Sequence, residues 1–428
     1  MATRYLPRIV DEELNLRMES FGATLIVGPK GCGKTTTARQ KAASVVELQD
    51  EDRRDGYLAV ASTQPSLLLE GAKPRLFDEW QDAPKIWGAI RKSVDDLQQT
   101  GLYLLTGSTS QEVSTPHTGT HRISTLNMLP MSLFESEESN GSVSLKALFD
   151  EPAGFGGCHS ELSVERLIFA LCRGGWPLAV NNRTRRAQLA VARDLFRQTC
   201  HVDVRNIDKG CNNAAWAEAI LCSYARNTCT MATTKTIRAD AQASTGMSDA
   251  SFYAYKRALE KLYVVDNLAA WTPAVRSKTA LRSSSKRNLV DPSLAVAAMG
   301  LSPEYFCEDF KTLGFLFECL CIRDLRAYAT ALGGRMSYYR DRYGLEADGV
   351  LHLSDGRYAL IEFKLGESEV DDGAKHLNKI ERLVAKRNEA ETQVPLRLPD
   401  LKLVVTATEY GYRRSDGVLV LPIGCLRD

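Results

Sequence analysis

The sequence predicts an α/β fold in which a parallel sheet comes first and helical and further α/β parts follow. Residues 23–27 are a short apolar run rich in β-branched residues, and a glycine-containing loop and a helix-like stretch at 36–44 follow it directly. Two more apolar segments, 75–77 and 102–105, lead into polar residues at their carboxyl ends. Buried strands that alternate with helices are typical of a parallel sheet covered by helices.

The loop at 28–35 reads GPKGCGKT and has the complete pattern of a phosphate-binding loop. Its glycines permit the dihedrals that point successive N–H groups at one anion. Lys34 is expected to reach the β- and γ-phosphates, and the Thr35 hydroxyl to ligate Mg²⁺. For Cys32, a small filler side chain is a simpler interpretation than a redox switch. We therefore predict that ATP, with Mg²⁺, contacts Gly28, Pro29, Lys30, Gly31, Cys32, Gly33, Lys34, Thr35 and Thr36.

An acidic pair at the end of the next strand supplies groups that the loop lacks. Asp78 can hold Mg²⁺ through water, and Glu79 can polarise the water that attacks the γ-phosphate. The following strand ends in the polar run 106–109, and ligands of open parallel sheets sit at such strand ends. One polar residue of this run is therefore expected to face the γ-phosphate.

Four segments, LIVGPKGCGKTTTA, LFDEWQDAP, LLTGSTS and HRISTLNMLPMSLFE, carry a resemblance in their order and spacing. They resemble a family of prokaryotic AAA-type P-loop ATPases, close to the signal-transduction (STAND) ATPases, whose C-terminal half is a domain of unknown function. The resemblance implies that Ser108 or Thr109 senses the γ-phosphate. It also implies that Arg122 is an arginine finger for a neighbour's nucleotide, and hence a homo-oligomer. The family usually has glycine where this chain has His121, so an ordinary surface role for Arg122 is the alternative.

Composition limits the class of protein. The chain has 428 residues, 44% hydrophobic and 25% charged, which suits a protein with several globular domains. A net charge of +1 gives no global field for nucleic acid or membranes. No apolar run approaches a membrane span, and the N-terminus lacks a signal peptide's apolar core. The 11 scattered cysteines include no CxxC pair, so we expect reduced thiols and a cytoplasmic location. Because no apolar run approaches a membrane span, we also expect no membrane contact.

Changes in composition and periodicity suggest four parts. We predict an ATPase domain at 1–136, a helical lid at 137–212, a winged helix-turn-helix at 213–290 and a nuclease-like domain at 291–428. Within the lid, 136–157 has the Glu, Ser, Asn and Gly content of an exposed connector. Two helices are then expected at 164–172 and 185–201, joined by the turn Gly174-Gly175-Trp176-Pro177.

The predicted winged helix consists of helices at 214–224, 234–243 and 249–263, followed by the start of a wing at 264–268. The third helix carries cations that are expected to be exposed and to contact DNA phosphates: Lys256, Arg257 and Lys261. The alternative is that the module only packs the lid against the rest of the chain, with these charges solvated.

A second set of chemical groups lies in the C-terminal third. Strands at 344–351 and 358–364, joined by the turn Ser354-Asp355-Gly356, are expected to form a hairpin that brings Asp348 beside Glu362. Lys364 shares a face with Glu362. This arrangement resembles the PD-(D/E)xK core of restriction-endonuclease-like enzymes, in which carboxylates bind Mg²⁺ and the lysine orients water. Glu318, in a helix-like stretch, matches the acidic residue that those folds contribute from a preceding helix.

The charge of this set favours a metal. Three acids and one base on one face leave an excess of negative charge, which is costly unless a cation joins them. We therefore predict that Glu318, Asp348 and Glu362 bind Mg²⁺ or Mn²⁺ beside Lys364. The alternative is a degenerate fold that keeps only ion pairs across the strands, with Glu346 as a further partner of Lys364.

Together these features predict an ATPase that couples ATP hydrolysis to engagement of DNA or another nucleic acid, with metal-dependent nuclease activity as an added option. The alternative function is a nucleotide-dependent regulatory or scaffold protein whose nuclease-like domain is inactive and only binds a partner. A small-molecule kinase is disfavoured, because the residues beyond the ATPase domain offer no evident acceptor site.

Overall fold

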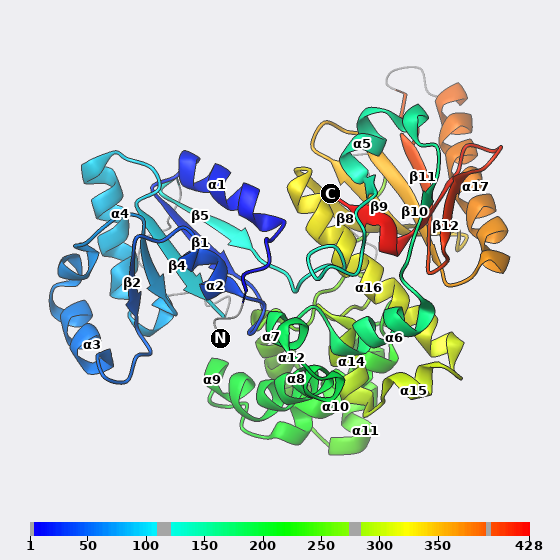
Figure 1. Ribbon diagram of the computed structural model, residues 1–428. Helices are drawn as coiled ribbons and strands as arrows, with labels where there is room; N and C mark the ends of the chain where they lie inside the picture. Colours follow the sequence, from blue (N-terminus) through cyan, green and yellow to red (C-terminus); the bar gives the residue numbers. More distant parts are fainter. Residues whose placement is uncertain (1–3, 109–120, 274–283, 391–394) are drawn as a thin grey trace.

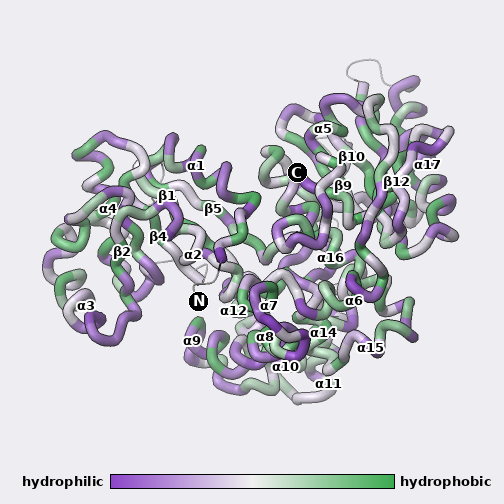
Figure 2. Tube along the Cα trace, viewed as in Figure 1, coloured by the Kyte–Doolittle hydropathy of each residue, from purple (hydrophilic) through white to green (hydrophobic). Residues whose placement is uncertain are grey.

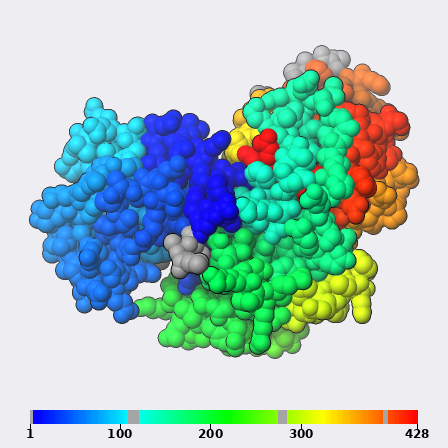
Figure 3. All heavy atoms as spheres, viewed as in Figure 1, coloured from blue at the N-terminus to red at the C-terminus, as the bar shows by residue number. Residues whose placement is uncertain are grey.

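The computed structural model describes residues 4–108, 121–273, 284–390 and 395–428. It contains an N-terminal α/β unit, a helical middle and a C-terminal α/β unit (Figure 1). The two sheets lie apart, and the helical part lies next to both of them (Figure 1). Figure 3 shows the dark-blue N-terminal segment between the rest of its own unit and the other two parts.

The N-terminal sheet is parallel and has the strand order β2-β3-β4-β1-β5. Every residue of the central strands β1 and β4 is buried, as expected for strands covered on both faces. In register, Val27 pairs with Gly107 and with Asn127, so the carboxyl ends of β1, β4 and β5 are level. The strands are β1 (Ala23–Val27), β2 (Ser44–Glu47), β3 (Arg75–Asp78), β4 (Tyr103–Gly107) and β5 (Ile123–Asn127).

Helices cover both faces of this sheet. Ile26 and Leu104 belong to the core that includes α1 and α2, whereas Leu25 and Leu105 pack with the apolar faces of α3 and α4. Successive strand residues therefore point to opposite layers, which gives the predicted α/β sandwich. The covering helices are α1 (Val10–Ser20), α2 (Lys34–Arg39), α3 (Arg54–Thr63) and α4 (Lys85–Leu97).

The middle of the chain is helical, as predicted, and side-chain caps set several helix starts. Ser163, Thr184, Thr233 and Ser248 each accept a hydrogen bond from a backbone N–H of the first turn that follows. The helices are α6 (Val164–Arg173), α7 (Pro177–Asn181), α8 (Arg185–Gln198), the π-helical turn η4 (Thr199–Asp203), α9 (Val204–Ile207), α10 (Ala214–Arg226), α11 (Thr234–Thr245), α12 (Asp249–Lys261), α14 (Pro292–Met299) and α15 (Pro303–Phe306).

After α12 the chain runs in an extended form that meets a later segment in antiparallel bridges. Val265 pairs with Leu289, and Leu268 with Lys286. Three helices followed by an extended pair agree with the secondary structure predicted for this part. The assignment as a winged helix-turn-helix stays a prediction.

The segment predicted as an exposed connector, 136–157, instead packs onto the C-terminal unit. β6 (Val143–Ser144) pairs with β14 (Leu426–Arg427), and β7 (Cys158–His159), just beyond this segment, pairs with β12 (Tyr410–Arg413). Between them, α5 (Leu145–Asp150) buries its apolar side chains. Residues 151–157 are mostly exposed, as predicted, but the apolar residues of α5 between the two polar stretches form a buried face, so the prediction was wrong for the middle of the segment.

The C-terminal sheet is mixed and has the strand order β7-β12-β13-β11-β10-β9-β8. The predicted hairpin is present, because β9 and β10 pair antiparallel with Gly349 opposite Ile361. α16 (Phe310–Ala331) shares a core with Ile361 and Leu403, while α17 (Val370–Ala390) packs with Leu360 and Val404 on the other face. The remaining strands are β8 (Gly334–Arg340), β9 (Glu346–Leu353), β10 (Tyr358–Lys364), β11 (Leu401–Thr406), β12 (Tyr410–Arg413) and β13 (Leu419–Pro422).

Within the described ranges, no helix is both long enough and apolar enough to cross a membrane. Figure 2 shows hydrophilic and hydrophobic residues mixed along the helices, as expected for helices that bury one face and expose another.

A buried ion network ties the parts of the chain together. On α16, Arg323 contacts Asp291 at 2.9 Å and Asp324 at 2.7 Å, and at most 2% of any of these side chains is exposed. Asp324 also accepts a hydrogen bond from the backbone N–H of Leu133, and Asp291 accepts one from Gly175, both at 2.9 Å. Burial raises the pKa of Asp324 to about 6, and Arg323 opposes this rise, so the carboxyl is ionised at neutral pH.

We expect Arg323→Met to lower the free energy of unfolding by about 3–5 kcal/mol, because it leaves two buried carboxylates without their cation. Urea unfolding monitored by circular dichroism measures the loss. Lys92→Met is the matched control, because Lys92 and Asp96 form an exposed pair worth at most about 1 kcal/mol. Equal effects of the two substitutions would mean that the network contributes nothing beyond a surface ion pair.

Candidate functional site

The glycine loop joins β1 to α2 and has the backbone geometry that the sequence predicts. Gly28, Gly31 and Gly33 have φ angles of 150°, 81° and 103°, a range that favours glycine. A Cβ atom on Gly28 would lie 2.1 Å from the carbonyl oxygen of Met128. Glycine is therefore required there both for its dihedrals and for the close approach of a neighbouring backbone.

Lys34 places a positive charge inside this loop. Its Nζ donates to the carbonyl oxygens of Gly28 at 3.0 Å and Pro29 at 2.9 Å, and the residue is 5% exposed. The ammonium group thus lies among the backbone groups that are expected to surround the phosphates.

The two predicted Mg²⁺ ligands of this site are in direct contact. The Thr35 hydroxyl donates to Asp78 Oδ1 at 2.6 Å, and the Thr106 hydroxyl donates to the same oxygen at 2.5 Å. A hydroxyl and a carboxylate are oxygen ligands of the kind that Mg²⁺ takes beside phosphates. The residues present therefore fit a nucleotide with its magnesium ion.

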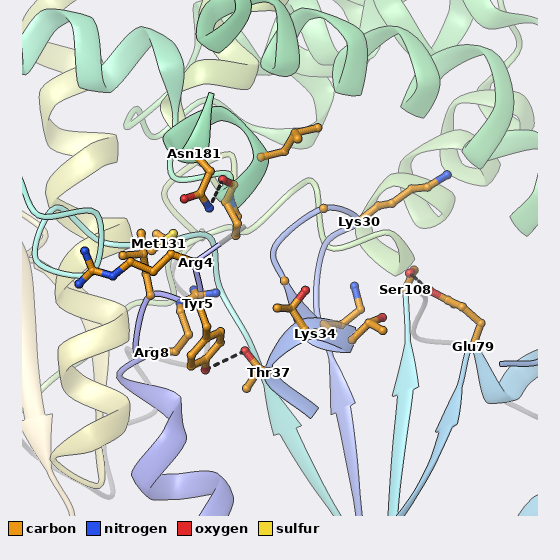
Figure 4. Close-up of a pocket in the computed structure, with 17 residues that line it drawn as sticks. Arg4, Tyr5, Arg8, Lys30, Lys34, Thr37, Glu79, Ser108, Met131 and Asn181 are labelled. Carbon is orange, nitrogen blue, oxygen red and sulfur yellow. Dashed lines mark hydrogen bonds between the residues drawn. The ribbon is translucent and has the colours of Figure 1, made fainter. Parts of the chain in front are cut away.

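Glu79 is held in an uncommon backbone conformation at the end of β3. Its φ of 52° lies in the left-handed region, and its N–H donates to the Thr106 hydroxyl at 3.2 Å. The Ser108 hydroxyl donates to Glu79 Oε1 at 2.7 Å (Figure 4), and Gln81 Nε2 donates to Oε2. Such strain is common at functional sites. Ser108 and Glu79 are thus together, while Thr109, the other predicted sensor, lies outside the described residues.

A cavity of about 370 Å³ opens over the loop, within the size range of ligand pockets. Figure 4 shows that its walls come from the N-terminal segment, the glycine loop, the ends of β3 and β4, and the region around α7. Its lining includes Tyr5, Arg8, Lys30, Lys34, Thr35, Thr36, Glu79, Ser108, Met131, Pro177 and Asn181.

The N-terminal wall is a feature that sequence reasoning missed. Arg8 is 6% exposed, and its guanidinium donates to the carbonyl oxygens of Cys32 at 2.7 Å and Leu129 at 2.8 Å and to Glu135 at 2.8 Å. The Tyr5 hydroxyl lies 3.3 Å from the Thr37 hydroxyl (Figure 4). No local pattern signals these contacts, because they join residues far apart in the sequence.

The other loop residues have distinct surroundings. Lys30 Nζ contacts Asp203 Oδ1 of η4 at 3.0 Å, which links the loop to the helical part. Cys32 is fully buried and its Sγ lies 3.6 Å from the Met128 carbonyl oxygen, in agreement with a filler role. Thr36 is exposed and borders the cavity.

Arg122 lies at the opposite edge of the sheet from the loop. Its carbonyl oxygen accepts from Ala23 N at the amino end of β1, at 3.0 Å, and its Nε donates to Asp95 of α4 at 2.7 Å. The length of β1 therefore separates Arg122 from the loop of its own chain. A finger role in this chain is possible only toward a neighbouring molecule.

Comparison with family models gives three matches. Residues 20–137 match an AAA domain. Residues 20–137 form an AAA-type P-loop ATPase domain. Residues 164–305 match a domain of unknown function (DUF8612), and residues 313–426 match another (DUF4143). The first of these two matches runs across the predicted boundary between the lid and the winged helix. No curated protein matches the chain.

Solved structures similar to the chain include three with low identity. A Walker-type ATPase of Pyrococcus abyssi is 14% identical, with 68% of this chain and 94% of that chain covered and a TM-score of 0.42. A STAND protein with a tetratricopeptide repeat sensor from Pyrococcus horikoshii is 13% identical, with coverages of 91% and 59% and a TM-score of 0.25. The Drosophila ORC bound to DNA is 12% identical, with coverages of 68% and 84% and a TM-score of 0.19. The ATPase assignment rests on the AAA match and on the geometry of the site.

The predicted C-terminal residues come close together, but around a cation that the sequence analysis did not include. Lys286 Nζ contacts Glu318 at 2.7 Å, Glu346 at 2.8 Å and Asp348 at 3.4 Å. Burial alone would lower the pKa of Lys286, but these carboxylates raise it well above its ordinary value. Lys286 is therefore charged at neutral pH.

Glu362 has its own partners. Lys364 Nζ lies 2.9 Å from one of its carboxylate oxygens, and His376 Nδ1 lies 3.7 Å from the other. Among the described residues, no group of three or more His, Cys, Asp or Glu side chains could hold a metal ion. The predicted Mg²⁺ or Mn²⁺ site at Glu318, Asp348 and Glu362 therefore does not fit this structure. The charge balance behind that prediction omitted Lys286.

The cations predicted on α12 are only partly exposed. Arg257 is exposed, whereas Lys256 is half-buried and pairs with Glu260 one helical turn away. Lys261 is also half-buried. The expectation of three exposed cations is thus met by Arg257 alone, since α12 packs against its neighbours more closely than its sequence indicates.

Proposed function

We propose that the chain is an Mg²⁺-dependent ATPase that uses nucleotide state to change how its ATPase domain contacts the rest of the molecule. One observation carries this proposal: the N-terminal segment, the glycine loop with the ends of β3 and β4, and the region around α7 together form the walls of the cavity. A nucleotide in such a cavity contacts all of them at once, so its binding and hydrolysis favour different arrangements of those parts.

The side chains at the site supply the groups that phosphoryl transfer needs. Lys34 offsets negative charge on the phosphates. Thr35 and Asp78 would hold the Mg²⁺ ion that accompanies the nucleotide. Glu79, positioned by Ser108 and Gln81, accepts the proton of the attacking water. When bound, Mg²⁺ offsets the charge that develops on the β- and γ-phosphates.

A hydrogen-bonded route from the cavity to the C-terminal domain supports the coupling. Met131, which lines the cavity, donates its N–H to the carbonyl oxygen of Gly175 at 2.6 Å. The N–H of Gly175 donates to Asp291, which pairs with Arg323 of α16. A shift of Met131 at the cavity wall is therefore transmitted through Gly175 and Asp291 to α16, the helix that packs against the C-terminal sheet.

Nucleic acid is the partner that we propose for this cycle, with the exposed Arg257 of α12 as a contact to phosphate. A second candidate is a nucleotide-dependent regulatory or scaffold protein. It is favoured by the C-terminal carboxylates, which pair with Lys286 and Lys364. In both candidates the ATPase domains assemble as a homo-oligomer.

Glu79→Gln tests the proposal. We expect hydrolysis to fall about 10²–10⁴-fold, as loss of a positioned general base does, while ATP binding is retained. Phosphate release measures turnover, and a fluorescent ATP analogue measures affinity. Asp82→Asn is the matched control, because this nearby carboxylate contacts Gln49 and does not line the cavity. Normal turnover in Glu79→Gln would assign activation of the water to another residue.

The ATP-bound Glu79→Gln protein also separates the two candidates. We expect it to bind labelled single- or double-stranded oligonucleotides with an affinity that differs between ATP and ADP, and Arg257→Glu to weaken that binding. Absence of binding in every nucleotide state would favour the regulatory or scaffold candidate.

A further inference from the structure

Lys286 reaches the C-terminal carboxylates from a different part of the chain. It lies in the extended pair formed by residues 264–270 and 286–290, where its backbone exchanges two hydrogen bonds of 2.9 Å with Leu268. This pair attaches to the edge strand β8. Ala269 accepts from the N–H of Tyr338 at 3.0 Å, and the Tyr338 carbonyl oxygen accepts from Trp271 at 2.7 Å. These backbone hydrogen bonds therefore fix the position of Lys286 next to the carboxylates.

The ammonium group fills the centre of the cluster. Only 2% of the Lys286 side chain is exposed, and its Nζ contacts one oxygen each of Glu318, Glu346 and Asp348. The ammonium donates hydrogen bonds to Glu318 and Asp348 and forms an ion pair with Glu346. A divalent cation needs several of the same oxygens at about 2.0–2.6 Å, and therefore the same place.

We propose that Lys286 is the resident cation of this cluster, taking the place of a divalent ion and locking the extended pair of residues 264–270 and 286–290 onto the C-terminal domain. This inference goes beyond the proposed ATPase function, because it concerns a site outside the ATPase domain. In this proposal the carboxylates bind Lys286 of the same chain and so hold the extended pair in place.

The charge balance of the cluster supports a permanent contact. Glu318 and Asp348 would be left partly buried without a cation if the extended pair moved away, and uncompensated buried charge is costly. Lys364 relieves only part of that cost, because its charge acts on Asp348 while its direct partner is Glu362. The lysine and the carboxylates therefore stabilise each other and hold the helical middle against the C-terminal sheet.

Binding of Mn²⁺ tests the proposal directly. The experiment uses nucleotide-free full-length protein carrying Asp78→Asn, so that the ATPase site does not contribute, and measures Mn²⁺ by calorimetry and electron paramagnetic resonance. We expect no Mn²⁺ at the cluster when Lys286 is present or replaced by arginine, which keeps the charge. We expect Lys286→Met to gain one Mn²⁺ site, and added Glu318→Gln and Asp348→Asn to remove it. Mn²⁺ binding that needs Asp348 while Lys286 is intact would overturn the proposal, as would a folded Lys286→Met protein that binds none.

A stability cycle keeps the proposal testable if Lys286→Met is too unstable for metal titration. We expect Lys286→Met to lower the urea midpoint, and the added substitutions Glu318→Gln and Glu346→Gln to restore part of it, because they remove charges that the lysine neutralised. Additive effects, with no restoration, would show that Lys286 does not neutralise these carboxylates and would overturn the proposal.

Discussion

Replacing Lys34 with alanine abolishes ATP hydrolysis and weakens nucleotide binding. Its ammonium lies inside the glycine loop, within 3.0 Å of two backbone carbonyl oxygens, and is almost fully buried. A charge at that place contacts the phosphates more strongly as negative charge develops on them, so its loss costs turnover at least about 10²–10³-fold. Steady-state phosphate release and titration with a fluorescent ATP analogue measure the two effects.

Lys30 provides a control within the same loop. Its side chain is half exposed and its Nζ contacts Asp203 of η4, so it contributes a tether to the helical part. We expect Lys30→Ala to change turnover only a few-fold and to leave nucleotide affinity largely intact. Wild-type hydrolysis in Lys34→Ala would remove the assignment of the nucleotide site, whereas similar losses in both variants would point to a general disturbance of the loop.

The ATPase site was predictable from the sequence because short stretches of chain build most of it. The loop needs glycine at fixed positions. Asp78 is the last residue of β3 and Glu79 follows it, so the parallel order of the sheet places both at the carboxyl edge. The C-terminal hairpin was predictable for the same reason, since a turn signal lies between two apolar strands. The left-handed conformation of Glu79 was not, because it depends on contacts from β4.

Contacts between distant segments were the part that sequence reasoning missed. Arg8 meets Glu135, and Lys286 meets Glu318, across separations that no local periodicity reports. The C-terminal cluster is the clearest case. Its own strands and helix supply fewer positive than negative charges, and Lys286, in the extended segment that follows α12, adds one more positive charge. When only the charges of the predicted C-terminal domain are counted, a metal ion is expected at this place. In the folded chain Lys286, from outside that domain, lies there.

Arg122→Ala is expected to lower ATP turnover by about a thousandfold or more, the contribution of an arginine finger that acts in trans. Arg122 lies at the amino edge of the sheet, beside the start of β1, and cannot reach the loop of its own chain. In an oligomer this edge can face the cavity of a neighbour once the contact with Asp95 is released. Turnover that rises more steeply than protein concentration measures the assembly, together with light scattering in the presence of ATP.

Mixing two inactive chains distinguishes a finger from a structural arginine. An Arg122→Ala chain keeps a complete cavity and lacks only the neighbour's arginine, which a Lys34→Ala chain still presents. Their mixture should regain activity. A mixture of Lys34→Ala with Glu79→Gln should stay inactive, because each chain then lacks a group that must come from its own cavity. Full activity in Arg122→Ala alone, or a monomer at every concentration with ATP bound, would leave Arg122 as a surface residue that pairs with Asp95.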